Sequence, residues 1–113
     1  MEGIVKFDEW QKLDLRVAKV VSVEDHPKAD KLVVLRIDLG VDLGERTLVA
    51  GLKKYYNKEE LEGKRCIVFV NLEPATLRGV KSEGMVLAAV DEANDKVVIL
   101  QPEEDIALGS KIQ

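Results

Sequence analysis

Hydrophobic and polar positions alternate with a period of two along most of the chain, which is the pattern of strands with one buried face. In the first such run, positions 15, 17, 21 and 23 are apolar and share one side, while positions 16, 22 and 24 are polar. A second run places positions 35, 37 and 39 inward and ends at Gly40, and a third, 46–50, ends at Gly51. We therefore predict three half-buried strands in the first half of the chain.

The second half of the chain continues the series of short strands. Residues 66–70 are apolar on both faces, which predicts a deeply buried strand. Residues 85–90 and 96–100 are expected to pair across a turn, and 109–112 to form a last short strand.

Two segments interrupt this pattern. Pro27 fixes its own torsion and restricts His26, so that the first two strands are joined by a turn. Between the third and fourth strands, Asn57 can cap a short helix that Gly63 ends. This arrangement predicts an all-β fold, a five-stranded Greek-key barrel of the oligonucleotide/oligosaccharide-binding (OB) type with a short helix between strands 3 and 4.

Residues 1–13 are predicted to be a helical appendage of a single domain that spans residues 1–113. Ile4, Phe7, Trp10 and Leu13 recur every three residues and make one apolar stripe on a short helix. Such a stripe needs a cover, which either the barrel itself or a second subunit can supply.

Size and composition favour one folded domain, since the 113 residues are 46% hydrophobic. No apolar run approaches the ~20 residues that cross a membrane, and no basic-then-apolar leader opens the sequence. We expect a soluble cytoplasmic protein without a membrane partner. The single Cys66 excludes an internal disulfide, and its apolar surroundings favour a small core residue over a nucleophile.

The net charge of −4 is unevenly distributed. Residues 51–82 contain seven cations and four anions, a balance of +3, whereas the remainder contains ten cations and seventeen anions, a balance of −7. An acidic body with a basic middle can steer an anionic partner onto one surface.

Catalytic constellations are not found in the sequence. His26 is the single histidine, it precedes a proline, and we expect it to be a turn or surface residue. No metal-ligand spacing or phosphate-binding glycine loop is present, so we expect no enzyme activity, no metal and no cofactor.

The segment 71–89, NLEPATLRGVKSEGMVLAA, combines cations, a hydroxyl and glycines. Its backbone and side chains could approach phosphates and base edges closely, or they could form a solvated hairpin loop. Tyr55 and Tyr56 follow two lysines and could contact RNA, or pack beside the helix. Because exposed aromatic residues are few, recognition of a folded RNA's backbone and shape suits this chain better than stacking along a single strand.

Three ordered motifs resemble the tRNA-binding domain found free-standing and at the C-terminus of many methionyl-tRNA synthetases. Related copies occur in the structure-specific tRNA-binding protein and in the CsaA-type chaperone. The motifs are DLRVAKVVSVEDHPKADKL at 14–32, TLVAGLKKYY at 47–56, and NLEPATLRGVKSEGMVLAA at 71–89.

The resemblance implies a homodimeric barrel that grips the outer corner of L-shaped tRNA, as an accessory domain or β subunit of methionyl-tRNA synthetase. We take the N-terminal stripe and the C-terminal tail as the dimer interface. The implied tRNA-binding residues are Lys31, Lys53, Lys54, Asn71, Arg78, Lys81, Ser82 and Met85; the dimer-interface candidates are Ile4, Phe7, Trp10, Ile106, Leu108 and Ile112.

Two positions depart from the family pattern, because Glu73 and Thr76 stand where basic residues are common. If those residues meet phosphate elsewhere, affinity here should be lower and less sensitive to salt. Two other functions stay open: a chaperone that holds unfolded polypeptide, with Leu77 and Met85 as exposed apolar groups, and a pure dimerisation domain.

Overall fold

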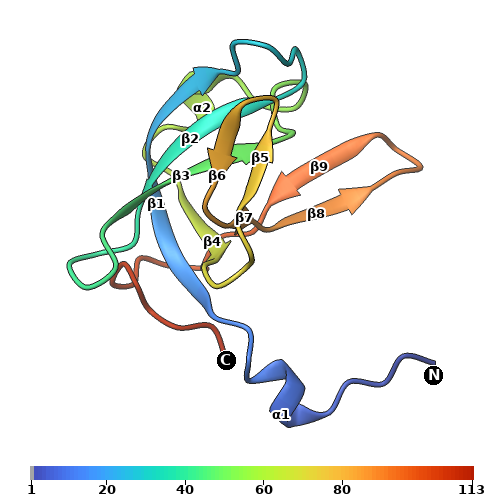
Figure 1. Cartoon of the computed structure of the whole chain (residues 1–113), viewed down its shortest axis with the longest axis vertical. Helices are drawn as coiled ribbons and strands as arrows, with labels where there is room; N and C mark the ends of the chain where they lie inside the picture. The colour runs from blue at the N-terminus through green and yellow to red at the C-terminus, as the bar shows by residue number, and fades with distance from the viewer. Residues whose placement is uncertain (1) are drawn as a thin grey trace.

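The chain forms a nearly closed antiparallel β-barrel, which confirms the predicted all-β, OB-like architecture (Figure 1). The computed structural model describes residues 2–113. Five strands follow the order β3-β2-β1-β4-β7, and two further pairs, β5-β6 and β8-β9, form hairpins. The strands are β1 (Leu15–Asp25), β2 (Val33–Asp38), β3 (Glu45–Ala50), β4 (Arg65–Phe69), β5 (Ala75–Leu77), β6 (Val80–Ser82), β7 (Met85–Val86), β8 (Ala88–Asp91) and β9 (Lys96–Ile99).

Two short helices complete the fold. The helix α2 (Lys58–Leu61) lies between β3 and β4, as the sequence predicts. The Asn57 N–H donates to the Glu60 side chain at 2.8 Å, and Gly63 ends the turn with a φ of +82°. The N-terminal appendage is helical only over α1 (Phe7–Trp10). Within residues 2–113, no helix is long and apolar enough to span a membrane.

The main core cluster lies inside the barrel and contains the residues at 35, 37 and 39 that were predicted to face inward, together with Cys66 and Val68 of β4. Ile67, on the other face of β4, belongs to a second, smaller cluster. The Cys66 thiol is buried in the main cluster, and burial raises its pKa to about 12, which is the state of an unreactive core side chain.

The prediction that Val21 faces inward is wrong, because Val21 is 47% exposed whereas Val20 is 1% exposed. The pairing of β1 with β2 shifts its register between Val20 and Ser22. Val21 is the extra residue of this β-bulge. Beyond it, Val23 joins Val20 in the main core cluster, whereas Leu15 and Val17 belong to the second cluster. A simple alternation cannot anticipate this extra residue.

The prediction of a last strand at 109–112 is also wrong, because these residues do not form a regular strand. The tail lies along the first half of β1, where the N–H groups of Gly109 and Ile112 donate to β1 carbonyls, each at 2.8 Å. Only one isolated bridge, Arg16 to Lys111, joins the two segments, because the φ of +87° at Gly109 interrupts extended backbone.

The barrel closes where residues 82 and 83 meet the outer strand β3. The Ser82 hydroxyl accepts a hydrogen bond from the Val49 N–H at 2.9 Å and donates one to the Gly84 carbonyl at 3.0 Å. The Glu83 N–H donates to the Thr47 carbonyl at 2.8 Å, and the Glu83 carboxylate accepts the Thr47 N–H at 3.2 Å. A side-chain hydroxyl and carboxylate therefore replace the backbone acceptors that a regular strand would present to β3.

Gly84 lets the chain turn from this closure into β7. Its φ is +144°, and a Cβ atom there would lie 2.8 Å from the Phe69 carbonyl oxygen. Both the torsion and the close approach require glycine.

Replacement of Ser82 by alanine should leave the buried Val49 N–H without an acceptor. We expect a loss of roughly 1–3 kcal/mol in the free energy of unfolding, measured by urea denaturation. Ser22→Ala, on the exposed side of β1, is the matched control and should change stability by less than about 0.5 kcal/mol. Equal unfolding midpoints for the two variants would contradict this role.

Replacement of Gly84 by alanine should destabilise the protein by about 2 kcal/mol or more, because it adds backbone strain and a steric clash. The control is Gly51→Ala, whose new Cβ would meet only Leu32 Cδ2, at 4.0 Å. Thermal unfolding of both variants tests the difference, and a Gly84→Ala protein as stable as the control would refute it.

Candidate nucleic-acid interface

The β5-β6 hairpin presents its tip to solvent. Every residue from 71 to 79 is exposed. The two central residues of the turn, Arg78 and Gly79, have φ values of +51° and +88°. Positive φ at both positions gives a tight two-residue turn whose twist matches that of the flanking strands. The sequence prediction of a tight cationic loop is therefore realised as a hairpin with Arg78 at its end.

His26 fastens this tip to the turn between β1 and β2. The prediction that His26 is a surface residue is wrong, because its exposure is 5%, although it does lie in a turn. The Lys28 N–H donates to Nδ1 at 3.0 Å, so that the proton resides on Nε2, which donates to the Leu77 carbonyl at 2.8 Å. In the sequence, the His-Pro pair marks this turn, but the residue that His26 contacts, Leu77, lies 51 positions away.

A groove separates the hairpin tip from the same turn. It is lined by residues 29–32 and by Arg78, with a volume of about 400 Å³. Lys31 and Arg78, two of the predicted tRNA-binding residues, are thus brought to the walls of one groove from segments far apart in sequence. Asp30 also lines it, but in the described part of the chain neither cation forms an ion pair within 4.0 Å.

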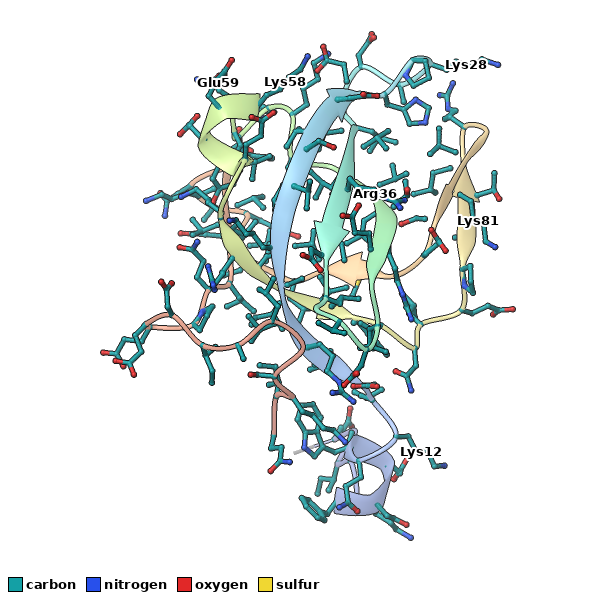
Figure 2. The ribbon with its side chains drawn as sticks, turned by 90° about the vertical axis from the view of Figure 1, so that its left-hand side faces the viewer. Lys12, Lys28, Arg36, Lys58, Glu59 and Lys81 are labelled. Carbon is teal, nitrogen blue, oxygen red and sulfur yellow. The ribbon has the colours of Figure 1, made fainter. Side chains whose placement is uncertain are left out.

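Further cations lie near this groove. Lys81 is exposed on β6, and Lys28 is exposed on the turn. Figure 2 shows Lys28 and Lys81 on one side of the barrel, across from Lys58 and Glu59 of α2. The six ion pairs found among residues 2–113 involve neither lysine. Lys28 was not among the residues singled out from the sequence, and its position beside Lys31 was the available signal.

Lys53 and Lys54 differ from these cations, because acidic side chains engage both. Lys53 lies 3.7 Å from Asp25, which also pairs with Lys58 at 3.3 Å. Lys54 forms an ion pair with Asp95, and this hydrogen bond lowers the pKa of Asp95 and raises that of Lys54. The partner acids reduce the attraction of both lysines for phosphate. These ion pairs weigh against a role for either lysine in tRNA contact, which stays a prediction.

Asn71 and Ser82 also have structural partners. The Asn71 amide accepts the Asp14 N–H at 2.8 Å and donates to the Lys12 carbonyl at 2.7 Å, which fastens the N-terminal arm to the end of β4. Ser82 is 5% exposed and closes the barrel. Both side chains already use polar groups within the protein, and direct contact of either with RNA stays a prediction.

Met85, at the start of β7, is 43% exposed. It is therefore not a core methionine, and its exposure agrees with the resemblance of the motif at 71–89. It lines a second groove of about 290 Å³ with apolar residues of β3, β8 and β9. The strand partner of Met85 is Phe69. This groove offers an apolar surface rather than charge.

The dimer-interface candidates divide into two sets. Ile4, Phe7 and Ile106 are exposed, with Phe7 at 71%. Trp10, Leu108 and Ile112 instead pack against a small cluster of barrel residues, so that Trp10 packs within its own subunit. A hollow lined by Phe7, Trp10 and Ile112 lies between the arm and the tail. Figure 1 places α1 and the C-terminus at the end of the barrel opposite the β1-β2 turn.

The described residues contain no group of three or more side chains that could hold a metal ion. The chemistry that the groove supports is the binding of an anion by the exposed cations Lys31 and Arg78.

Comparison with known proteins agrees with this geometry. A family model described as "Putative tRNA binding domain" matches residues 15–111. A methionine–tRNA ligase of Pyrococcus abyssi is 53% identical over 112 residues, which cover 99% of this chain and 15% of that enzyme. The chain thus spans about one-seventh of the length of that relative.

Solved structures show the same architecture. A "MetRS related protein" of Pyrococcus horikoshii has a TM-score of 0.90 and 35% identity, with all of both chains covered. The chaperone CsaA of Bacillus anthracis has a TM-score of 0.87 and 38% identity, with 98% of this chain and 100% of that chain covered. Because the family model matches nearly the whole barrel, this chain belongs to the tRNA-binding domain family.

Proposed function

We propose that this chain is a non-catalytic module that binds tRNA through the tip of the β5-β6 hairpin. The observation that carries the proposal is the groove between Arg78 and Lys31, whose cations have no ion-pair partner among the described residues. Phosphate oxygens accept hydrogen bonds from arginine in a fixed, two-pronged geometry and attract lysine as a point charge.

The partner is the outer corner of L-shaped tRNA. Two exposed cations at one groove provide backbone contacts, which position a protein on RNA without reading its sequence. The surface around the groove has few exposed aromatic rings for stacking, so the features of the RNA that it recognises are shape and backbone. Since the whole chain carries a net charge of −4, unpaired cations also orient the barrel as it approaches an anionic surface.

The module works as a homodimer through the exposed apolar arm. Phe7 and Ile4 are exposed at the end of the barrel away from the hairpin tip, so that dimerisation leaves both cationic grooves accessible. Two grooves on one rigid body increase the effective concentration of the second site once the first has bound.

The biological setting is an accessory role for methionyl-tRNA synthetase in the cytoplasm, either as its C-terminal domain or as a separate β subunit. The similarity to a short part of a methionine–tRNA ligase supports this setting. The module would raise the local concentration of tRNA at a catalytic domain without supplying chemistry.

A second candidate function is the holding of unfolded polypeptide. The similarity to the chaperone CsaA and the apolar groove beside Met85 favour it. Suppression of the aggregation of a model substrate, unaffected by added tRNA, would select this function over the first.

Removal of the cation at the hairpin tip should weaken tRNA binding. We expect Arg78→Ala to lower the affinity for total tRNA by roughly tenfold, because a hydrogen bond to a charged group contributes about 1.5 kcal/mol or more. Fluorescence anisotropy at several salt concentrations measures this change. The dependence of log affinity on log salt should also become shallower, since fewer counterions are released.

The control for Arg78→Ala is Lys96→Ala, which removes an exposed cation from β9 and the same unit of charge. It should leave affinity nearly unchanged. Equal losses of affinity in the two variants would point to net charge alone.

Recognition of the tRNA corner is tested with an acceptor–T-stem minihelix that lacks the folded corner. It should bind more weakly than intact tRNA, and equal binding of minihelix and tRNA would exclude corner recognition.

Introduction of a charge on the exposed arm should prevent dimerisation. We expect Phe7→Glu to raise the dimer dissociation constant by about tenfold or more, because burial of an aromatic side chain contributes about 1.5–3 kcal/mol. Analytical ultracentrifugation measures it, with Val90→Glu on β8 as a control at an equally apolar, exposed position. A wild-type protein that stays monomeric at high concentration would contradict the dimer.

A further inference from the structure

We propose that His26 is a positioning residue that holds both walls of the cationic groove, so that Arg78 and Lys31 are preorganised for one phosphodiester of the RNA backbone. This inference rests on the proposed function and extends it to a residue that does not itself contact RNA. His26 and Ser82 are the two buried polar side chains within residues 2–113, and Ser82 is used in barrel closure.

One wall of the groove is fixed by the imidazole. Its Nε2–H donates to the Leu77 carbonyl, and Leu77 immediately precedes Arg78. The hydrogen bond therefore fixes the plane of the peptide group from which Arg78 extends. Together with the positive φ of Arg78, this sets the direction of the Cα–Cβ bond from which the side chain leaves the turn.

The hairpin needs such an attachment. Its base is held where Ser82 and Glu83 close the barrel, but β5 is exposed along its whole length. In the described part of the chain, the bond from His26 is the one hydrogen bond that joins residues 75–81 to anything outside the hairpin. Without it, hydrogen bonds hold the hairpin only at its base, and the tip gains freedom to move.

The other wall is fixed by two further hydrogen bonds of the same residue. The His26 N–H donates to the Leu32 carbonyl at 3.1 Å, and Nδ1 accepts the Lys28 N–H at 3.0 Å. These bonds close the loop that carries Lys31. Since one residue holds both segments, the backbones that carry the two cations keep a defined separation before RNA arrives.

Preorganisation increases affinity because the protein then has less conformational freedom to lose when RNA binds. A flexible arginine and a loose hairpin would both lose conformational freedom on meeting a phosphate, and that loss reduces affinity. Residues 71–82 contain two cations, Arg78 and Lys81, so the placement of each has greater weight.

Two substitutions separate the bonds that the imidazole makes. Asparagine can accept the Lys28 N–H, as in an Asx turn, but is too short to reach the Leu77 carbonyl. Glutamine places its amide nitrogen near the position of Nε2, where it can donate to Leu77, but lacks an acceptor at the position of Nδ1. We expect His26→Asn to lower affinity for total tRNA by about threefold to tenfold. His26→Gln should lose less, because the backbone bond from residue 26 to Leu32 still closes the loop that carries Lys31.

A double-mutant cycle with Arg78→Ala tests whether His26 acts through Arg78. On the Arg78→Ala background, His26→Asn should cause little further loss of tRNA affinity. Circular dichroism and the urea midpoint of each protein show whether the barrel is folded. If His26→Asn does not fold, His26→Ser takes its place in the cycle, because a serine hydroxyl can also accept the Lys28 N–H but is too short to reach the Leu77 carbonyl.

The outcomes distinguish this inference from the function on which it rests. If Arg78→Ala itself binds tRNA like wild type, the proposed function fails. If Arg78→Ala weakens binding, the inference is overturned by any of three results: unchanged affinity of folded His26→Asn, equal losses in the asparagine and glutamine variants, or losses that add in the double mutant. A non-additive loss, larger for asparagine than for glutamine, supports it.

Discussion

Closure of the barrel through residues 82–84 is the constraint on which the rest of the structure depends. A short link must join the outer strand β3 to β7, and it does so with a hydroxyl, a carboxylate and one backbone N–H instead of a full strand ladder. Because this link also forms the base of the β5-β6 hairpin, closing the barrel determines where the hairpin leaves its surface. The motif that suggests RNA binding thus contributes first to the fold.

The arrangement of charges explains how an acidic protein can present a cationic surface. Several cations are matched by acids, as in the pairs Lys54–Asp95 and Arg65–Asp105, and these pairs contribute little net potential. Those at the hairpin tip and the adjoining turn lack such partners in the part of the chain that the structure describes. The potential near the groove therefore depends on which cations are paired, rather than on the total charge.

The two proposed binding surfaces lie at opposite ends of the barrel and are linked through the segment that follows β4. Asn71, in that segment, binds the backbone of residues 12 and 14 and so fastens the apolar arm. The same residue begins the exposed segment that leads to Arg78. A dimer formed through the arm would therefore carry its cationic grooves in a defined relative orientation.

The sequence by itself determined the strands β1 to β4, the helix α2 and the cationic turn at Arg78, because these depend on local periodicity, caps and turn residues. The bulge that exposes Val21, the burial of His26 and the pairing of Lys54 with Asp95 were decided only by the tertiary structure. Each involves groups that meet across the fold, in the last case 41 residues apart. Local patterns describe which side chains are available for a site, but hydrogen bonds and ion pairs between distant segments determine which of them remain free to bind a ligand.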